Sequence, residues 1–268
     1  MPGRTARILL TLLFAGFLLF LYGPTLTITV LSFQGPDGGL TFPMNGTSLH
    51  WFRRLFATQA VGDIGAALRR SLGLAAMVTA CTVLVSLAAG MAFRRRFPGG
   101  TVLFYLTLAS LIVPSILVSL GVGLLFNQME WEPAWYSSAF GAQLTWTLPF
   151  GLLIMFAVFN RFDRAWEEAA RDLGATPWQG FLHVVLPIIA PSVVGIALFG
   201  FTLSFDEFAR TLLTAGSGNT LPLEILGMTT TVTTPVLYAL GTASTALSFL
   251  VIGLAMLGVD SLRKQRGK

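Results

Sequence analysis

Long apolar runs alternate with short polar stretches along this chain. There are six runs, and they cover residues 8–33, 71–93, 97–129, 133–160, 173–205 and 225–259. About 20 apolar residues cross a bilayer as a helix, and helices are expected because backbone groups inside a bilayer must satisfy one another. We therefore predict an all-α integral membrane protein in which residues 1–268 form one transmembrane domain. Its six helices are expected at about residues 8–33, 71–93, 101–126, 140–159, 191–213 and 236–259.

Prolines and turn residues indicate where these helices bend or end. Pro114 lies near the middle of the third predicted helix, where a proline removes a backbone hydrogen bond, so we expect a kink there. The membrane portion of the fifth helix is expected to start near Pro191, and a turn-rich segment, residues 214–235, should link it to the last helix. Residues 48–56 mix aromatic and arginine side chains, which is typical of a short helix at the membrane interface.

The composition supports a membrane location. Only 11% of the residues are charged and 54% are hydrophobic, whereas a soluble domain carries about 25% charged residues. Apolar side chains that face lipid need no polar cover, so lipid is an expected partner. The basic start could begin a cleaved signal peptide, but the apolar run continues to Phe33 without a convincing cleavage site. A retained first helix is therefore expected.

The net charge of +5 is distributed unevenly between the two predicted sides of the membrane. One side holds 12 of the 17 basic residues: Arg4, Arg7, Arg94, Arg95, Arg96, Arg161, Arg164, Arg171, Arg263, Lys264, Arg266 and Lys268. By the positive-inside rule this side is the cytoplasm, so both termini are expected there. Four arginines on the other side weaken this bias without reversing it. The placement argues against a nucleic-acid partner.

Candidate chemistry for catalysis or metal binding is sparse. Cys81 is the only cysteine, and no Cys/His cluster offers a metal site. A membrane-embedded enzyme is not indicated, because the chain has no His-x-x-x-His motif and no paired aspartates across helices. The chain also lacks a Gly-x-x-x-x-Gly-Lys-Ser/Thr phosphate loop, so it is not expected to hydrolyse ATP. We therefore expect no catalytic residues and no metal.

The only dense cluster of mixed charge lies in the loop of residues 160–190. Residues 163–172 are expected to form an amphipathic helix that Gly174 terminates. A second short helix, residues 178–186, should follow and end before Pro187. An ordinary solvated loop would also fit this composition. A partner docking on the loop is the alternative, because its charges and small residues could meet another surface.

The loop resembles a specific motif. Its pattern is Glu168-Ala169-Ala170, three residues, Gly174, eleven residues, then Leu186-Pro187. This resembles the EAA motif of permease subunits of ATP-binding cassette importers, although Val184 stands where the family usually has isoleucine. The resemblance implies a cytoplasmic coupling helix that docks in a groove of an ATPase. The residues implied in this coupling are Arg164, Glu167, Glu168, Ala169, Ala170, Asp172, Gly174, Leu186 and Pro187.

Other stretches are similar to the spermidine/putrescine branch of that family, and in particular to its C-type permease. They include residues 167–175, Ser204-Phe205-Asp206-Glu207-Phe208, Thr220-Leu221-Pro222 and Leu21-Tyr22-Gly23-Pro24. The resemblance implies the type I importer fold in a bacterial inner membrane. It also implies three kinds of protein partner: two ATPase subunits, a second homologous permease subunit and a periplasmic substrate-binding protein. ATP and Mg²⁺ would be bound by the ATPase, and no cofactor by this chain.

Substrate contacts are expected first at Asp206 and Glu207, because an ionisable residue inside a bilayer is costly and suggests function. Two carboxylates could attract a cation such as a polyamine. The alternative is a local ion pair with Arg210, four residues after Asp206. Further candidates to line the pathway are Ser204, Trp146, Phe150 and Asn127. A permease for an amino-acid derivative, a phosphonate or an iron chelate, or an ion-coupled transporter, stays open as an alternative.

Overall fold

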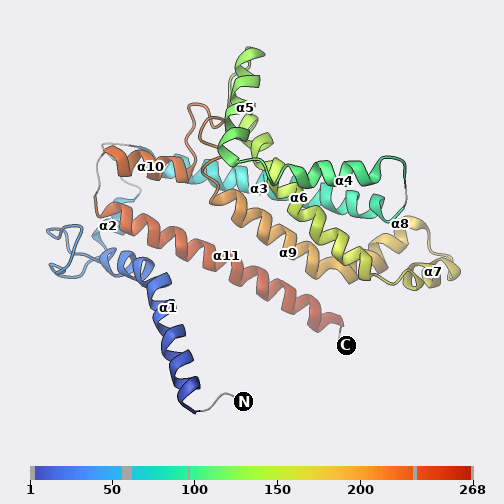
Figure 1. The fold of residues 1–268 in the computed structure, drawn as a ribbon, viewed down its shortest axis with the longest axis horizontal. Coiled ribbons are helices and arrows are strands. Elements are labelled where there is room, and N and C mark those ends of the chain that lie inside the picture. The colour runs from blue at the N-terminus through green and yellow to red at the C-terminus, as the bar shows by residue number, and fades with distance from the viewer. Residues whose placement is uncertain (1–3, 56–61, 96, 232–233, 267–268) are drawn as a thin grey trace. The chain divides into compact units, whose positions relative to one another are not determined.

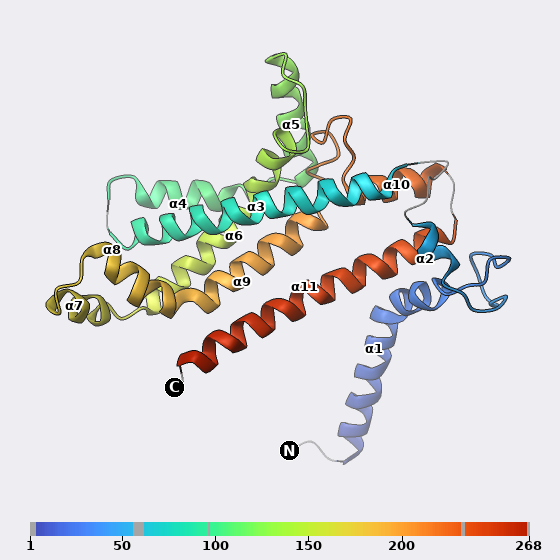
Figure 2. The same cartoon turned by 180° about the vertical axis from the view of Figure 1, so that it is seen from behind.

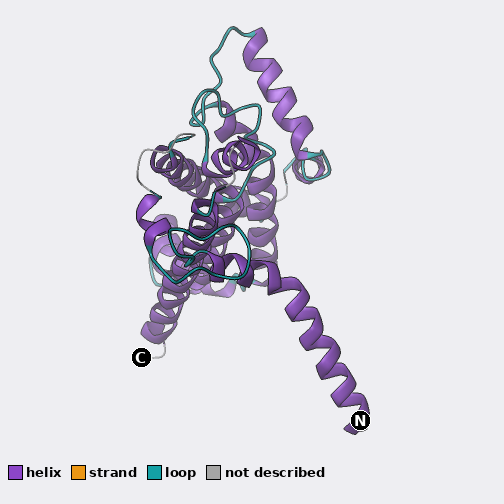
Figure 3. Cartoon of the chain, turned by 90° about the vertical axis from the view of Figure 1, so that its left-hand side faces the viewer, coloured by secondary structure: helices purple, strands orange, loops and turns teal. Residues whose placement is uncertain are grey.

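The computed structural model describes residues 4–55, 62–95, 97–231 and 234–266, with side chains up to residue 258. Every regular element among these residues is helical (Figures 1 and 3), which confirms the predicted all-α class. The elements are α1 Arg4–Leu31, α2 His50–Arg54, α3 Ile64–Phe93, α4 Gly100–Ala109, α5 Ser115–Gln128, α6 Ser138–Arg161, α7 Ala165–Asp172, α8 Pro177–Gly180, the π-helix η1 Phe181–Val185, α9 Leu186–Phe205, α10 Leu221–Thr231 and α11 Val236–Arg266.

Five helical stretches of the described residues are long and apolar enough to cross a membrane. They are Arg4–Leu31, Ile64–Phe93, Ser138–Arg161, Pro177–Phe205 and Val236–Gly258. The third predicted helix, residues 101–126, is instead two shorter helices, α4 and α5. Pro114 adopts an extended conformation (φ −55°, ψ 132°) and α5 begins at the next residue. A proline also keeps the residue before it out of the helical region, so the chain breaks here rather than kinking. The count of six passes remains a prediction in which α4 and α5 together form the third.

The fifth predicted helix differs at both ends. The chain remains helical from Pro177 through η1 into α9, with no stop before Pro187. In η1 the backbone widens, and the Leu186 amide donates to the Phe181 carbonyl. We attribute this wide turn to Pro187, which has no amide hydrogen and would crowd the carbonyl of a regular turn. At the other end α9 stops at Phe205 rather than at residue 213, and turns follow it.

Three smaller differences complete the comparison. α3 begins at Ile64 rather than at residue 71, and α11 extends to Arg266 rather than ending at residue 259. The segment predicted as a turn-rich loop, residues 214–235, contains the helix α10. The short interfacial helix predicted within residues 48–56 is present as α2.

The chain divides into two compact units, residues 1–65 with 225–249 and residues 66–224 with 250–268. In the first unit the Tyr238 hydroxyl donates to the Leu40 carbonyl (2.8 Å), which fastens the loop after α1 to the start of α11. Most of α1 is exposed within this unit. In the second unit, α6 and α9 pack along each other, and α4 contacts α6.

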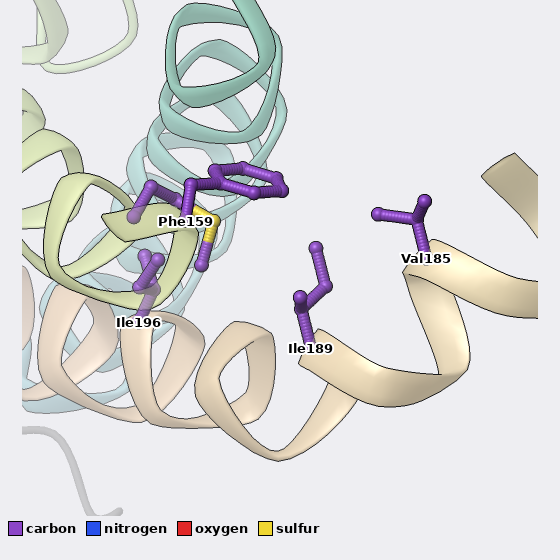
Figure 4. Packing of buried hydrophobic residues seen from close by; sticks show 5 residues of the cluster. Phe159, Val185, Ile189 and Ile196 are labelled. Carbon is purple, nitrogen blue, oxygen red and sulfur yellow. The ribbon is translucent and has the colours of Figure 1, made fainter. Parts of the chain in front are cut away.

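The core of the second unit lies where α3, α6 and α9 meet. Its buried side chains, shown in Figure 4, are Met155, Phe159, Val185, Ile189 and Ile196. Gly90 of α3 allows a close approach, because a Cβ there would lie 2.8 Å from the Met155 Cβ. Membrane helices commonly pack through such small residues. Val185 and Ile189 belong to η1 and α9, so this core holds the end of the bundle that carries α7 and α8 (Figures 1 and 2).

Candidate functional site

The start and end of α7 are both fixed by local hydrogen bonds. The Asp163 carboxylate accepts from the Ala165 amide (2.9 Å), which satisfies a free donor at the helix start. At the other end Gly174 has a φ of +85°, in the left-handed region. Its amide donates to the Arg171 carbonyl (2.8 Å), and the next amide donates to the Ala170 carbonyl (3.0 Å). This pair of bonds is the Schellman motif, so the predicted helix and its terminator are both present.

The two sides of α7 have different surroundings. Glu168, Ala169 and Asp172 are exposed, and they share one side of the helix by their spacing. Leu173, just beyond the helix, has 89% of its surface exposed. Glu167 and Ala170 are half-buried on the opposite side. The helical spacing therefore separates the predicted coupling residues of α7 into an outward group and an inward group.

The inward residue Glu167 is held by Arg94, which directly follows α3. The Arg94 guanidinium donates from Nη1 to Glu167 Oε1 (3.0 Å) and from Nη2 to the other carboxylate oxygen. It also lies 5.1 Å from the ring centres of both Phe159 and Phe162. The Arg164 guanidinium donates in turn to the Arg94 carbonyl (2.7 Å). α7 is thus tied to the end of α3 by a forked ion pair and by a second bond in the reverse direction.

This pairing changes the acidity of Glu167. The hydrogen bond from Arg94 lowers the pKa of the carboxyl below its ordinary value, and partial burial opposes the shift without reversing it. The charges of Arg94, Arg171 and Arg164 act in the same direction as the hydrogen bond. Glu167 therefore carries its negative charge at neutral pH, as the ion pair with Arg94 requires.

The second half of the motif forms the root of the loop. Thr176 and Gln179 make a capping box in which each accepts a hydrogen bond from the other's backbone amide, and Pro177 occupies the first turn. The predicted residues Leu186 and Pro187 begin α9 and are half-buried. The adjacent Val185 is the side chain that enters the core. The motif therefore extends from an exposed helix to a buried anchor.

The candidate pathway residues Asp206 and Glu207 have different environments. Asp206 follows the last residue of α9 and is exposed. Glu207 is buried, accepts from the Arg210 amide (2.8 Å) and lies 3.7 Å from the Arg210 guanidinium. The ion pair of Arg210 therefore involves Glu207, three residues before it, rather than Asp206. Within the part of the chain that the structure describes, no side chain donates to the Asp206 carboxylate.

Arg210 joins several segments of the second unit. Its guanidinium donates from Nε to Thr145 Oγ1 (3.2 Å) and from Nη1 to Ser115 Oγ (2.7 Å). The same group lies 4.7 Å from the centre of the Trp146 ring. α5, α6 and the turn after α9 thus meet at one buried cation. One face of Trp146, a predicted pathway residue, is covered by this internal cation.

The other pathway candidates lie in separate places. Ser204 is buried, and its hydroxyl donates to the side chain of Gln143 in α6. Phe150 packs edge-on against Trp146 and Phe199. Asn127, near the end of α5, lines a separate hollow of about 570 Å³ together with Leu120, Leu124, Glu130, Trp131 and Glu132. Trp146 and Phe150 thus belong to α6, Ser204 bonds α6 directly and Glu207 is linked to it through Arg210. Asn127 is not part of this group.

Sequence reasoning missed the most connected residue of the site, Arg94. It appeared only as one of three consecutive arginines in a basic loop, and its partner Glu167 is 73 residues away. Nothing in the local pattern distinguishes Arg94 from Arg95. The partners of Arg210 in α5 and α6 were missed for the same reason. Among the described residues, no group of three or more His, Cys, Asp or Glu side chains could hold a metal ion.

Residues 82–264 match a protein family described as the inner membrane component of binding-protein-dependent transport systems. The chain belongs to this family. As a member it is a non-catalytic, multi-pass permease subunit of an inner membrane. The putrescine transport system permease protein PotI of Escherichia coli K12 is 30% identical over 241 residues, which cover 87% of this chain and 84% of that protein. The spermidine/putrescine transport system permease protein PotC of Haemophilus influenzae is 29% identical, and the aligned residues cover 89% of this chain and 91% of that protein.

Solved structures support the fold of this permease subunit. A crystal structure of a bacterial ABC transporter involved in the import of the acidic polysaccharide alginate superposes with a TM-score of 0.66. That comparison covers 100% of this chain and 98% of the other at 14% identity. A bacterial alginate ABC transporter in complex with an alginate pentasaccharide-bound periplasmic protein gives a TM-score of 0.62 at 15% identity. This superposition covers 98% of this chain and 94% of the other. Likeness at this identity concerns the fold alone, and it agrees with the predicted importer type.

Proposed function

We propose that this permease subunit forms half of the pathway of an ATP-driven importer for a polyamine such as putrescine or spermidine. The names of its relatives at 27–30% identity, putrescine and spermidine/putrescine permeases, support the substrate class. The mechanism is supported by the structure of α7, a short helix with hydrogen-bonded caps at both ends and one exposed side. Such a helix suits docking into a soluble ATPase, because it presents a rigid face beyond the helix bundle.

In this proposal α7 lies on the cytoplasmic side with both termini, as the distribution of basic residues favours. Two ATPase subunits, which hold ATP and Mg²⁺, dock on α7 and on its counterpart in a second, homologous permease. A periplasmic binding protein delivers the substrate from the other side. ATP binding closes the ATPase pair, and the docked helices convert this movement into alternating access between two packings of the bundle. α4 and α5 together form the third pass.

The exposed side of α7 defines the surface that the ATPase groove must match. Glu168 and Asp172 supply two carboxylates, and Ala169 between them lets another backbone approach closely. Leu173 adds an apolar side chain that is almost fully exposed. A groove with a basic rim and an apolar floor would complement this surface. Glu167 contributes differently, because its carboxylate is directed to Arg94 rather than outward.

Of the two pathway carboxylates, Asp206 is the better candidate to contact a cationic substrate. Its exposed carboxylate has no cation beside it among the described residues, whereas the charge of Glu207 is balanced by Arg210. Glu207, Ser204, Trp146 and Phe150 would then shape the wall behind it. An ionised carboxylate at this position would attract a cationic substrate and repel an anionic one.

The proposal is tested with the complete importer in proteoliposomes, using binding protein loaded with putrescine or spermidine. ATP-dependent uptake is expected from the wild type. Glu168→Lys should insert in the membrane normally but lose the ATPase on co-purification, because a carboxylate at the docking face becomes a cation. Asp206→Asn should raise the KM for the polyamine. Uptake without ATP would instead indicate an ion-coupled transporter, and mass spectrometry of the co-purified binding protein would reveal an amino-acid derivative, a phosphonate or an iron chelate.

A further inference from the structure

One arginine, Arg94, makes the ion pair between α7 and the end of α3. We propose that Arg94 is a positioning residue that holds α7 at a fixed orientation, so that a push on α7 moves α3 and α6 rather than only the loop. This inference rests on the proposed function, because it assumes that α7 receives the push from the ATPase.

The first argument is that α7 has no buried anchor of its own, although it contacts the neighbouring η1 and α8. None of its eight residues is buried, so no apolar side chain of α7 anchors it in a core. Its neighbours along the chain are turns, including the left-handed Gly174. A helix of this length is also unstable alone and takes its orientation from tertiary contacts. The polar contacts with Arg94 therefore add to this local packing and link α7 to the end of α3.

The second argument is the geometry of the Arg94 contacts. The guanidinium makes a forked pair with Glu167, and the Phe159 and Phe162 rings lie at equal distance from it. The side chains of Arg94 and Glu167 are only 10% and 18% exposed, so water screens this pair less than a surface pair. A forked, charge-assisted pair also fixes an angle, whereas a single bond would allow rotation.

The third argument is the position of Arg94 in the fold. It directly follows α3, and Gly90, one turn earlier, packs closely against Met155 of α6. The Arg164 side chain also bonds the Arg94 carbonyl, so both the side chain and the backbone of Arg94 are held by the α7 segment. A displacement of α7 would therefore act on the end of α3 and, through the Phe159 contact, on α6.

Arg95 provides a matched comparison on the same loop. It carries the same charge but is exposed, and its side chain makes no hydrogen bond or ion pair with any residue that the structure describes. A general effect of positive charge would be shared by the two arginines. A positioning role predicts that only Arg94 matters. Lysine at position 94 separates charge from geometry, because it keeps the charge and loses the planar fork.

The experiment compares Arg94→Gln, Arg94→Lys and Arg95→Gln in the reconstituted importer. Three quantities are measured: co-purification of the ATPase, ATP hydrolysis, and substrate molecules taken up per ATP hydrolysed. Arg94→Gln should still bind the ATPase and hydrolyse ATP, but uptake per ATP should fall about tenfold, the scale of losing a charge-assisted hydrogen bond. Uptake per ATP in Arg94→Lys should lie between the values for Arg94→Gln and the wild type. Arg95→Gln should match the wild type.

A charge reversal gives the decisive comparison and covers the case that Arg94→Gln does not fold. Arg94→Glu or Glu167→Arg alone should lower uptake per ATP, and the double variant should recover several-fold over either. If the Arg94–Glu167 ion pair only stabilises the fold, the variants would change protein yield without changing uptake per ATP. Unchanged uptake per ATP in Arg94→Lys and in both reversals, or an equal loss in Arg95→Gln, would overturn the inference. If α7 is not the docking helix of the proposed function, Glu168→Lys will retain the ATPase and transport normally, whatever the Arg94 variants do. If transport is not driven by ATP, wild-type uptake will proceed without it.

Discussion

The left-handed conformation of Gly174 allows a prediction about α7 that separates backbone geometry from side-chain size. With a φ of +85°, Gly174 forms the C-terminal cap of α7. A Cβ built at this position would meet nothing within 4 Å. Any cost of a substitution in the isolated subunit is therefore conformational rather than steric.

The magnitude follows from the preference of L-residues for negative φ. The left-handed conformation costs most residues about 1–2 kcal/mol, whereas asparagine tolerates it better. A cost of this size changes a population by a factor of about 5–30. The affinity of the ATPase for the permease should therefore decrease in the order Gly174, Gly174→Asn, Gly174→Ala, Gly174→Val, with about a fivefold or larger loss for alanine. Asparagine is larger than alanine, so the order does not follow size.

The assay is the binding constant between the ATPase and the importer's membrane subunits in lipid nanodiscs, together with ATP-dependent uptake. Gly180→Ala is the matched control, because Gly180 has a helical φ of −57° and also has open space around it. Alanine there should be neutral or slightly stabilising. The reasoning is refuted if Gly174→Ala binds better than Gly174→Asn, which would mean that the partner requires a small residue, or if Gly180→Ala is equally harmful.

Three further predictions concern the contacts around the site. The stabilisation from Glu167 should be fully present above the ordinary carboxyl pKa of 4.5 and should be lost as the pH falls through the lowered pKa of the folded protein. The difference in Tm between the wild type and Glu167→Gln should therefore be constant from about pH 6 to 8 and shrink only in more acidic buffer. Arg210→Met should destabilise the protein by about 3–5 kcal/mol because it leaves a buried carboxylate unpaired, whereas Asp206→Asn should leave thermal unfolding in detergent almost unchanged; equal shifts would contradict the assigned ion pair. Gly90→Ala should cost about 1–3 kcal/mol by overpacking against α6, and the open helical position Gly141→Ala should not; a neutral Gly90→Ala would show that α3 can move aside.

The pattern of apolar residues alone determined much of the architecture. Runs of about 20 apolar residues have few stable alternatives to membrane helices, because lipid cannot satisfy backbone groups. α7 and its terminator Gly174 were also predictable, since helix composition and a C-terminal glycine act over a few residues. The prediction of a permease subunit, confirmed by the family match, came from motif residues that lie close together in sequence. The substrate contacts and the partners stay predictions.

Only the tertiary structure decided which of several similar residues is engaged. Arg94 and Arg95 are equivalent in sequence, and packing between α3, α6 and α7 selects the first as the partner of Glu167. Glu207 rather than Asp206 pairs with Arg210, because α9 ends at Phe205 and the following turns place Glu207 inside. Two prolines likewise have different effects. The helix is interrupted at Pro114, whereas at Pro187 it continues through the wide turn of η1. Local pattern cannot distinguish these outcomes, since each depends on side chains that lie far apart in sequence and meet only after the helices pack.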